Sequence, residues 1–131
     1  MGALRGEGRM AYDKSNIFAR ILRGEIPSKK VYEDEHVLAF HDINPQTPVH
    51  VLFIPKGAYA SLDDFTERAS DAEIAALFRA IGKIARHFGV DKTGYRFLAN
   101  NGRDANQEVP HFHVHLFAGK NLGRMIKPAD K

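Results

Sequence analysis

Hydrophobic and polar residues alternate strictly near the C-terminal end of the chain. The segment from 111 to 117 reads His-Phe-His-Val-His-Leu-Phe, and successive side chains of a β-strand point to opposite faces of a sheet. A strand here would place His111, His113 and His115 on one face, and Phe112, Val114 and Leu116 on the core face. Residues on one face lie about 6.5 Å apart, so the imidazoles would form a row about 13 Å long, which suits an extended phosphate group.

The same kind of pattern predicts four further strands and a short helix. Strands are expected at residues 30–33, 37–41, 49–55 and 95–99, where β-branched and aromatic residues lie between turn residues. Apolar residues at helical spacing predict a short helix over residues 17–22, with a polar cap before it and a glycine after it.

The longest helix is expected between a capping box that starts at Ser70 and a stop at Gly89. Its apolar positions share one face, expected to pack on the sheet: Ile74, Leu77, Phe78, Ile81, Ile84, Ala85 and Phe88. Gly82 is expected to permit close approach to the sheet, and a turn of helix is expected at residues 62–65. Short strand connections favour an α+β domain with about five antiparallel strands, one long helix and one short helix.

Length and composition indicate one ordinary globular domain. The chain has 131 residues, of which 44% are hydrophobic and 27% charged. Its formal charge of +3 suits anionic ligands, but the basic residues are scattered, so a nucleic-acid-binding groove is not expected. The sequence contains no apolar run of membrane-spanning length and no cysteine, which fits a cytoplasmic protein. Residues 1–14 lack periodicity and are expected to be a disordered leader before a single domain at 15–131.

The histidines allow more than one interpretation. Three in strict alternation are hard to explain as structural residues alone, although His50, inside the apolar run at 49–55, could be a core histidine bonded to a backbone carbonyl. Zinc is a second interpretation, since His-x-His on a strand offers two ligands. His111 and His115 fit one ion poorly, however, so further ligands would have to come from His50 or an Asp. A zinc site stays an alternative that metal analysis would test, whereas the leading interpretation below requires no metal.

Several blocks in fixed order resemble the histidine triad family. They are Phe-His-Asp-Ile-Asn-Pro-Gln at 40–46, the run from Val49 to Lys56, His-x-His-x-His at 111–115 and Leu-Gly at 122–123. The resemblance extends from about residue 16 to 125 and favours the nucleotide-binding branch over the diadenosine-polyphosphate and uridylyltransferase branches. It implies a small homodimer whose two sheets join edge to edge. It also implies hydrolysis of purine nucleoside phosphoramidates, such as AMP or GMP joined through nitrogen to an amine, without a cofactor.

The resemblance further implies roles for the four histidines. His113 would be the nucleophile that attacks the α-phosphorus, expels the amine and becomes a nucleotidyl-imidazole, which water then hydrolyses. His115 would contact the phosphate, while His111 and His50 would orient the site and balance its charge.

Other positions match the family's nucleotide contacts. Asp42 matches the acidic residue that holds the ribose hydroxyls, and Ile43 would lie against the base. Three positions match contacts to ribose and phosphate: Asn100, Gln107 and the backbone around Asn106. Glu108 stands where some relatives have a serine proposed to protonate the leaving group. Relatives often have Gly-Gly where this chain has Ala105-Asn106, so a positive φ in that loop would have to be adopted by asparagine.

Elementary chemistry supports a histidine nucleophile independently. Imidazole has an ordinary pKa near 6.5 and is a competent unprotonated nucleophile at neutral pH. An amine leaving group needs a proton, which a neighbouring imidazolium can supply. The competing hypothesis is a nucleotide-binding module without catalysis, which would bind AMP-like ligands in the same pocket and form no covalent adduct.

Overall fold

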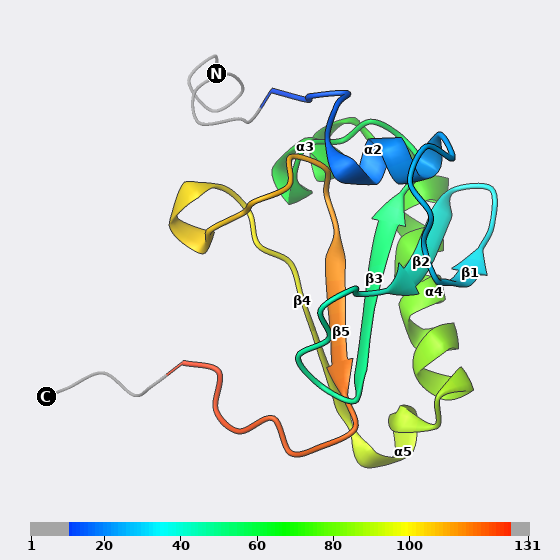
Figure 1. The fold of residues 1–131 in the computed structure, drawn as a ribbon, viewed down its shortest axis with the longest axis vertical. Coiled ribbons are helices and arrows are strands. Elements are labelled where there is room, and N and C mark those ends of the chain that lie inside the picture. The colour runs from blue at the N-terminus through cyan, green and yellow to red at the C-terminus, as the bar shows by residue number, and fades with distance from the viewer. Residues whose placement is uncertain (1–10, 127–131) are drawn as a thin grey trace, which may run out of the picture.

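A five-stranded antiparallel sheet forms the centre of the molecule, in the strand order β1-β2-β3-β5-β4 (Figure 1). The structure is a computed structural model and describes residues 11–126. The elements follow one another as α2 (Ile17–Leu22), β1 (Lys30–Glu33), β2 (Val37–His41), β3 (Val49–Pro55), α3 (Leu62–Arg68), α4 (Asp71–His87), α5 (Val90–Thr93), β4 (Tyr95–Leu98), a 3-10 helix (Arg103–Ala105) and β5 (Val114–Ala118). The α+β prediction with five antiparallel strands is confirmed. The turn of helix expected at residues 62–65 is present as α3, which extends to Arg68, and α5 was not predicted.

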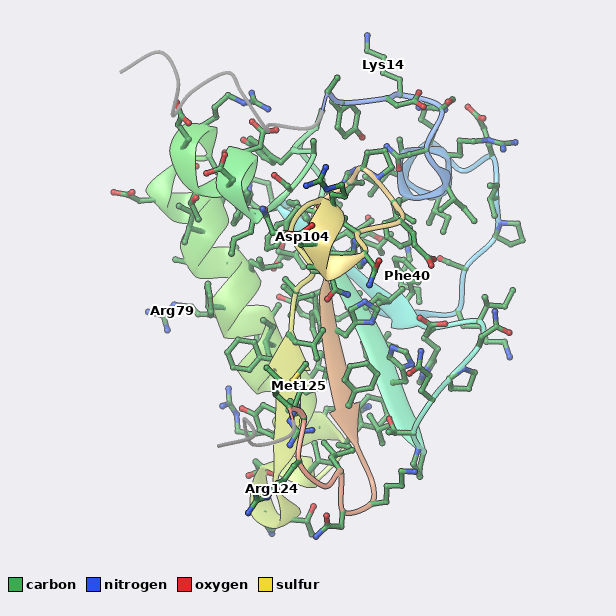
Figure 2. All side chains as sticks on the ribbon, turned by 90° about the vertical axis from the view of Figure 1, so that its left-hand side faces the viewer. Lys14, Phe40, Arg79, Asp104, Arg124 and Met125 are labelled. Carbon is green, nitrogen blue, oxygen red and sulfur yellow. The ribbon has the colours of Figure 1, made fainter. Side chains whose placement is uncertain are left out.

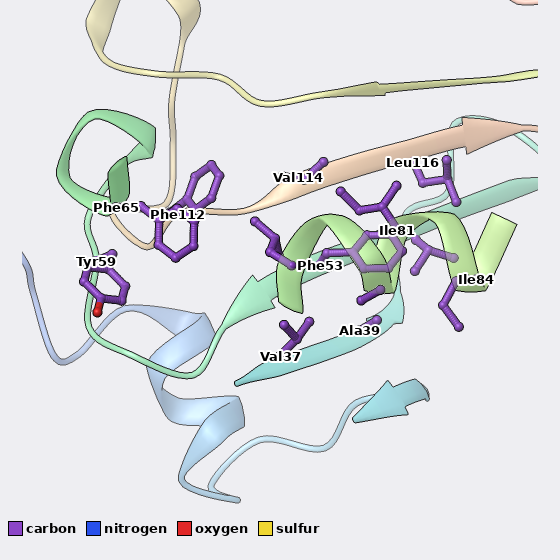
Figure 3. Packing of buried hydrophobic residues seen from close by; sticks show 13 residues of the cluster. Val37, Ala39, Phe53, Tyr59, Phe65, Ile81, Ile84, Phe112, Val114 and Leu116 are labelled. Carbon is purple, nitrogen blue, oxygen red and sulfur yellow. The ribbon is translucent and has the colours of Figure 1, made fainter. Parts of the chain in front are cut away.

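Helix α4 covers one face of the sheet. Ser70 Oγ accepts from the backbone N–H of Glu73, and the Glu73 carboxylate accepts from that of Ser70, so the predicted capping box is present. The helix buries Leu77, Ile81 and Ile84, with two alanines, against side chains of β2, β3 and β5 (Figure 3). This apolar layer is the main core of the protein.

Two details of α4 differ from the prediction. Phe78 is 54% exposed and meets Phe97 of β4 edge to face, because it lies one residue beyond Leu77 and therefore about 100° around the helix. Gly82 does not serve close approach to the sheet. A Cβ there would meet the guanidinium of Arg86, on the helix's own surface.

Helix α2 lies on the opposite side of the sheet from α4 (Figure 2). Asn16 caps it by accepting from the backbone N–H of Ala19, and Gly24 follows it with a φ of 79°. Phe18 packs on Phe40 within a second cluster that also contains Leu38, Leu52 and Ile54. This cluster covers part of that face, and the histidines of β3 and β5 lie on the same face.

Most of the expected leader, residues 1–10, lies outside the described residues. Within residues 11–14, Tyr12 is half-buried and its hydroxyl lies 2.8 Å from Nδ1 of His111. This part of the expected leader therefore makes a tertiary contact. Along the described range 11–126, none of the helices has the length and apolar character needed to cross a membrane.

Candidate functional site

The strand at the histidines is shorter than predicted. It begins at Val114, so only His115 of the three lies on β5, and the expected row of three imidazoles on one strand is wrong. Pro110 has no backbone N–H, and the N–H of Phe112 donates to the Tyr59 carbonyl at 2.8 Å, outside the sheet. The chain therefore enters the sheet three residues later than alternation alone suggests, at Val114 instead of His111.

His111 is fully buried and both of its ring nitrogens have partners. Nε2 lies 2.9 Å from the Pro55 carbonyl, and Nδ1 lies 2.8 Å from the Tyr12 hydroxyl. A carbonyl only accepts, so Nε2 carries the proton, and Nδ1 then accepts from the tyrosine. Burial lowers the pKa of His111 to about 4, although the Pro55 carbonyl opposes this shift. The imidazole is therefore neutral at neutral pH.

His113 is held in the opposite tautomer. Its Nδ1 lies 2.8 Å from the backbone carbonyl of His111, so Nδ1 carries the proton and Nε2 carries a lone pair. The ring is buried and meets Phe18 edge to face at 4.9 Å. Burial lowers its pKa, while the His111 carbonyl and Asp42 act in the other direction. The result is a neutral imidazole whose Nε2 is chemically prepared to attack an electrophile.

His50 and His115 are joined across β3 and β5. The backbone N–H of Gln46 donates to Nδ1 of His50 at 3.1 Å, so the proton of a neutral His50 is on Nε2. That N–H faces Nδ1 of His115 at 2.9 Å, which places the proton of His115 on its own Nε2. Phe117 stacks on His115 at 5.4 Å and contacts His50 at 4.3 Å. His115 therefore offers an N–H donor at the site.

Burial also lowers the pKa values of this pair. The pKa of His50 falls below its ordinary value, and that of His115 falls to about 4 through burial, followed by repulsion from His113 and His50. His113 and His115 lie with ring centroids 5.1 Å apart. Burial thus keeps His50, His111, His113 and His115 neutral at neutral pH in the free protein, so these four residues supply unprotonated ring nitrogens but no imidazolium.

Asp42 brings a carboxylate to the imidazoles. Its Oδ2 lies 3.4 Å from Nε2 of His50, and its Oδ1 accepts from the backbone N–H of Asn44. Asp42, His50 and His115 could together hold a metal ion, since their ligand atoms all lie within 4.8 Å of one another. The N–H···N bond between the two imidazoles occupies the same atoms, so a metal would have to replace that proton.

The loop after β4 has the conformation that its sequence requires. Asn106 has φ 58° and ψ 44°, which is the left-handed region, and within residues 11–126 it is the one residue besides glycine with a positive φ. The prediction that asparagine adopts this conformation is confirmed. Ala105 ends the preceding 3-10 helix.

Gln107 uses its side chain within the protein. Its amide N–H groups donate to the carbonyls of Ala60 and Val109, at 2.7 and 3.0 Å, and its oxygen accepts from the N–H of Gly102. These bonds tie the loop to the segment before α3. Ligand contact by this side chain would therefore break existing bonds.

The other predicted contact residues are accessible. Ile43 is 91% exposed beside Asp42, Glu108 is exposed and Asn100 is half-buried. The structure thus brings together Asp42 and the histidines, whereas Asn100 and Glu108 make no described contact with the imidazoles.

Three contributors to the site were not predicted from the sequence. Phe117 continues the alternation beyond His115 and could have been found from that signal. Tyr12 stands in a segment without periodicity, and Gln46 acts through its backbone, so neither gives a sequence signal. Gln46 and Phe117, which both contact His50, also line a cavity of about 330 Å³. Its other lining residues are Thr47, Arg96, Leu98, Lys120, Asn121, Leu122 and Met125.

Comparison with known proteins identifies the family and the fold. The model of the HIT domain matches residues 23–122. An uncharacterised 13.2 kDa HIT-like protein of Azospirillum brasilense is 67% identical over 88% of this chain and 94% of its own length. Purine nucleoside phosphoramidase of Escherichia coli is 40% identical over 86% of this chain and 94% of its own length. The structure of a histidine triad protein from Clostridium difficile is 45% identical, with a TM-score of 0.77 over 87% of this chain and 98% of that chain.

Proposed function

Since the chain belongs to the histidine triad (HIT) family, in its nucleotide-binding branch, we propose that it hydrolyses the P–N bond of purine nucleoside 5′-phosphoramidates. The observation that supports this most is the tautomer of His113, whose Nδ1–H is held by the His111 carbonyl so that Nε2 is unprotonated. The phosphoramidase named among its relatives supports the reaction class.

The proposed reaction has two steps. In the first, Nε2 of His113 attacks the α-phosphorus, a bond from phosphorus to imidazole nitrogen forms, and the bond from phosphorus to the amine breaks. In the second, water attacks the nucleotidyl-imidazole, which releases AMP or GMP and restores His113. His115, with its proton on Nε2, is placed to donate a hydrogen bond to a phosphoryl oxygen.

The amine must gain a proton as it leaves. Because burial lowers the pKa of His115 to about 4, the free protein holds no protonated donor there at neutral pH. An anionic phosphoryl group beside the imidazoles favours their charged forms and raises their pKa values. Substrate binding therefore favours uptake of a proton from solvent by an imidazole of the site, and this proton is transferred to the departing amine.

The nucleoside is proposed to lie beside Asp42 and Ile43. The carboxylate of Asp42 would hold the ribose hydroxyls, and the exposed Ile43 side chain would cover the purine. Asn100, the backbone at Asn106 and Glu108 are proposed to border the ribose, the phosphate and the leaving group. Gln107 acts by holding this loop, because its amide is bonded within the protein.

A homodimer is proposed to form along β4. This strand lies at one edge of the sheet, where unpaired backbone groups invite pairing with another strand. Three large apolar side chains are exposed there: Phe78 by 54%, Phe97 by 50% and Tyr95 by 39%. Edge-to-edge pairing of β4 would cover them and join two sheets. Sedimentation at micromolar concentration should give twice the chain mass, and Phe97→Lys should shift it toward the monomer.

A cytoplasmic location also stays a prediction.

Turnover of adenosine 5′-phosphoramidate tests the proposed reaction. We expect continuous release of amine and AMP, many times per protein molecule. AMP binding without amine release would instead favour the nucleotide-binding module, which the same pocket would support.

A further inference from the structure

The hydroxyl of Tyr12 makes a contact that the family match does not include. The HIT domain model begins at residue 23, whereas Tyr12 precedes α2 and contacts a histidine 99 residues later in the chain. Its Oη lies 2.8 Å from Nδ1 of His111, with the two rings edge to face at 5.6 Å. A segment outside the matched domain therefore reaches the triad.

The position of this segment is fixed by its link to α2. Both the backbone N–H of Asn16 and its side-chain amide donate to the Asp13 carbonyl, at 3.0 and 2.7 Å. Asn16 is also the cap of α2, which carries Phe18 against the rings of His111 and His113. Tyr12 is thus placed by the same helix that packs on the histidines.

The tyrosine hydroxyl completes the bonding of a fully buried ring. The Pro55 carbonyl accepts a hydrogen bond from Nε2–H of His111, so Nδ1 needs a donor. Among the described residues, only Tyr12 supplies one. A buried acceptor that loses its donor is strongly penalised. Held at both nitrogens, the His111 ring keeps one orientation and one tautomer.

We propose that Tyr12 is a positioning residue for the nucleophile, acting through His111. The His111 carbonyl accepts from Nδ1–H of His113 at 2.8 Å and so keeps Nε2 of His113 unprotonated. Loss of the Tyr12 hydroxyl loosens residue 111 and with it this carbonyl, and part of the His113 population then moves its proton to Nε2, where it cannot attack phosphorus. The effect on catalysis rests on the proposed function, whereas the effect on the tautomers does not.

Tyr12→Phe tests the proposal, because it removes the hydroxyl and keeps the ring. Tyr32→Phe is the matched control. Tyr32 lies on β1, is also half-buried, and donates a hydrogen bond from its hydroxyl to the Asp34 carboxylate at 2.7 Å. We expect kcat for adenosine 5′-phosphoramidate to fall about tenfold in Tyr12→Phe with KM changed less than twofold, and neither to change in the control. Unchanged kcat in Tyr12→Phe, or an equal loss in the control, would overturn the proposal.

Nitrogen-15 NMR of the imidazoles supplies a readout that does not depend on turnover. The wild type should show His111 protonated at Nε2 and His113 at Nδ1, and Tyr12→Phe should give His113 a measurable fraction of the Nε2–H form. If the nitrogen-15 shifts of His111 and His113 in Tyr12→Phe equal those of the wild type, the role of Tyr12 is rejected. If the wild type turns over no phosphoramidate but the shifts change as expected, the proposed function fails and the positioning role of Tyr12 stands.

Discussion

Both sides of the sheet contain fully buried side chains, but the chemistry of these side chains differs. On the α4 side, Val37, Phe53 and Leu116 are fully buried among other apolar residues. On the other side, His50 and His111 are just as buried, yet each imidazole carries two polar atoms that need partners. The first side needs only shape, whereas the second needs a specific donor or acceptor at each ring nitrogen that it buries.

In the proposed function, that difference means that neutral backbone groups set the tautomer of the nucleophile. Each inferred tautomer follows from a fixed group: the Pro55 carbonyl, the His111 carbonyl or the Gln46 N–H. Burial keeps the rings neutral, and these groups decide which nitrogen carries the proton. Substitutions of histidines on one side should therefore lower turnover, whereas truncation of apolar side chains on the α4 side should lower the free energy of unfolding.

The largest expected effect is the loss of catalysis on the histidine side. His113→Ala and His113→Asn should lower turnover of adenosine 5′-phosphoramidate at least about a thousandfold, because the attacking nitrogen is gone. His87→Ala, at the exposed end of α4, is the matched control and should keep full turnover. Steady-state amine release measures both, and turnover preserved in either His113 variant would contradict the assignment.

The largest expected effect on stability lies on the α4 side. Leu77→Ala should lower the free energy of unfolding by about 3 kcal/mol, because it leaves a cavity in a fully buried layer. Arg79→Ala, on the exposed surface of the same helix, should change it by less than about 0.5 kcal/mol. Urea unfolding at pH 7.5 gives both values. Equal losses would mean that α4 does not pack as described.

Acid should destabilise the histidine side selectively. The folded-state pKa of His111, about 4, lies below its ordinary value of 6.5, so its contribution is complete above pH 6.5 and is lost as the pH falls toward 4. The loss should be about 3 kcal/mol from His111 alone. Urea unfolding between pH 7.5 and 4.5 measures this. A constant unfolding free energy over that range would show that the rings are not held neutral.

The smallest expected effect is that of metal removal. Because the inferred tautomers place a proton between His50 and His115, turnover should change less than twofold after dialysis against EDTA. Added zinc should bind Asp42, His50 and His115 in place of the proton between the two imidazoles, and should inhibit turnover. Activity that is lost with EDTA and restored by zinc would replace the nucleophile account with a metal site.

The sequence predicted the α4 side better than the histidine side for a physical reason. Periodicity reports burial, so the bounds of β1, β2 and β3 and the capping box of α4 were predicted correctly, and Phe78 failed only at the margin of its helix face. The positive φ of Asn106 was expected from the family resemblance, because relatives have Gly-Gly where this chain has Ala105-Asn106.

Hydrogen-bond partners distant in the sequence leave no periodic signal. Tyr12 and Pro55 could not be assigned to His111 before the fold was known, and the alternation at 111–117 did not show that the chain stays outside the sheet until Val114. The resemblance to the histidine triad family supplied the candidate site residues, and their roles stay predictions. The structure shows which nitrogen of each is protonated, through the partner that each one has.

Mass spectrometry of the protein quenched within milliseconds of mixing with adenosine 5′-phosphoramidate tests the central claim most directly. With EDTA present and amine release followed in parallel, the account predicts an adenylate on the peptide that contains residues 111–117, located at His113 and absent from His113→Asn. Amine release without any adduct, or an adduct on another histidine, would contradict it.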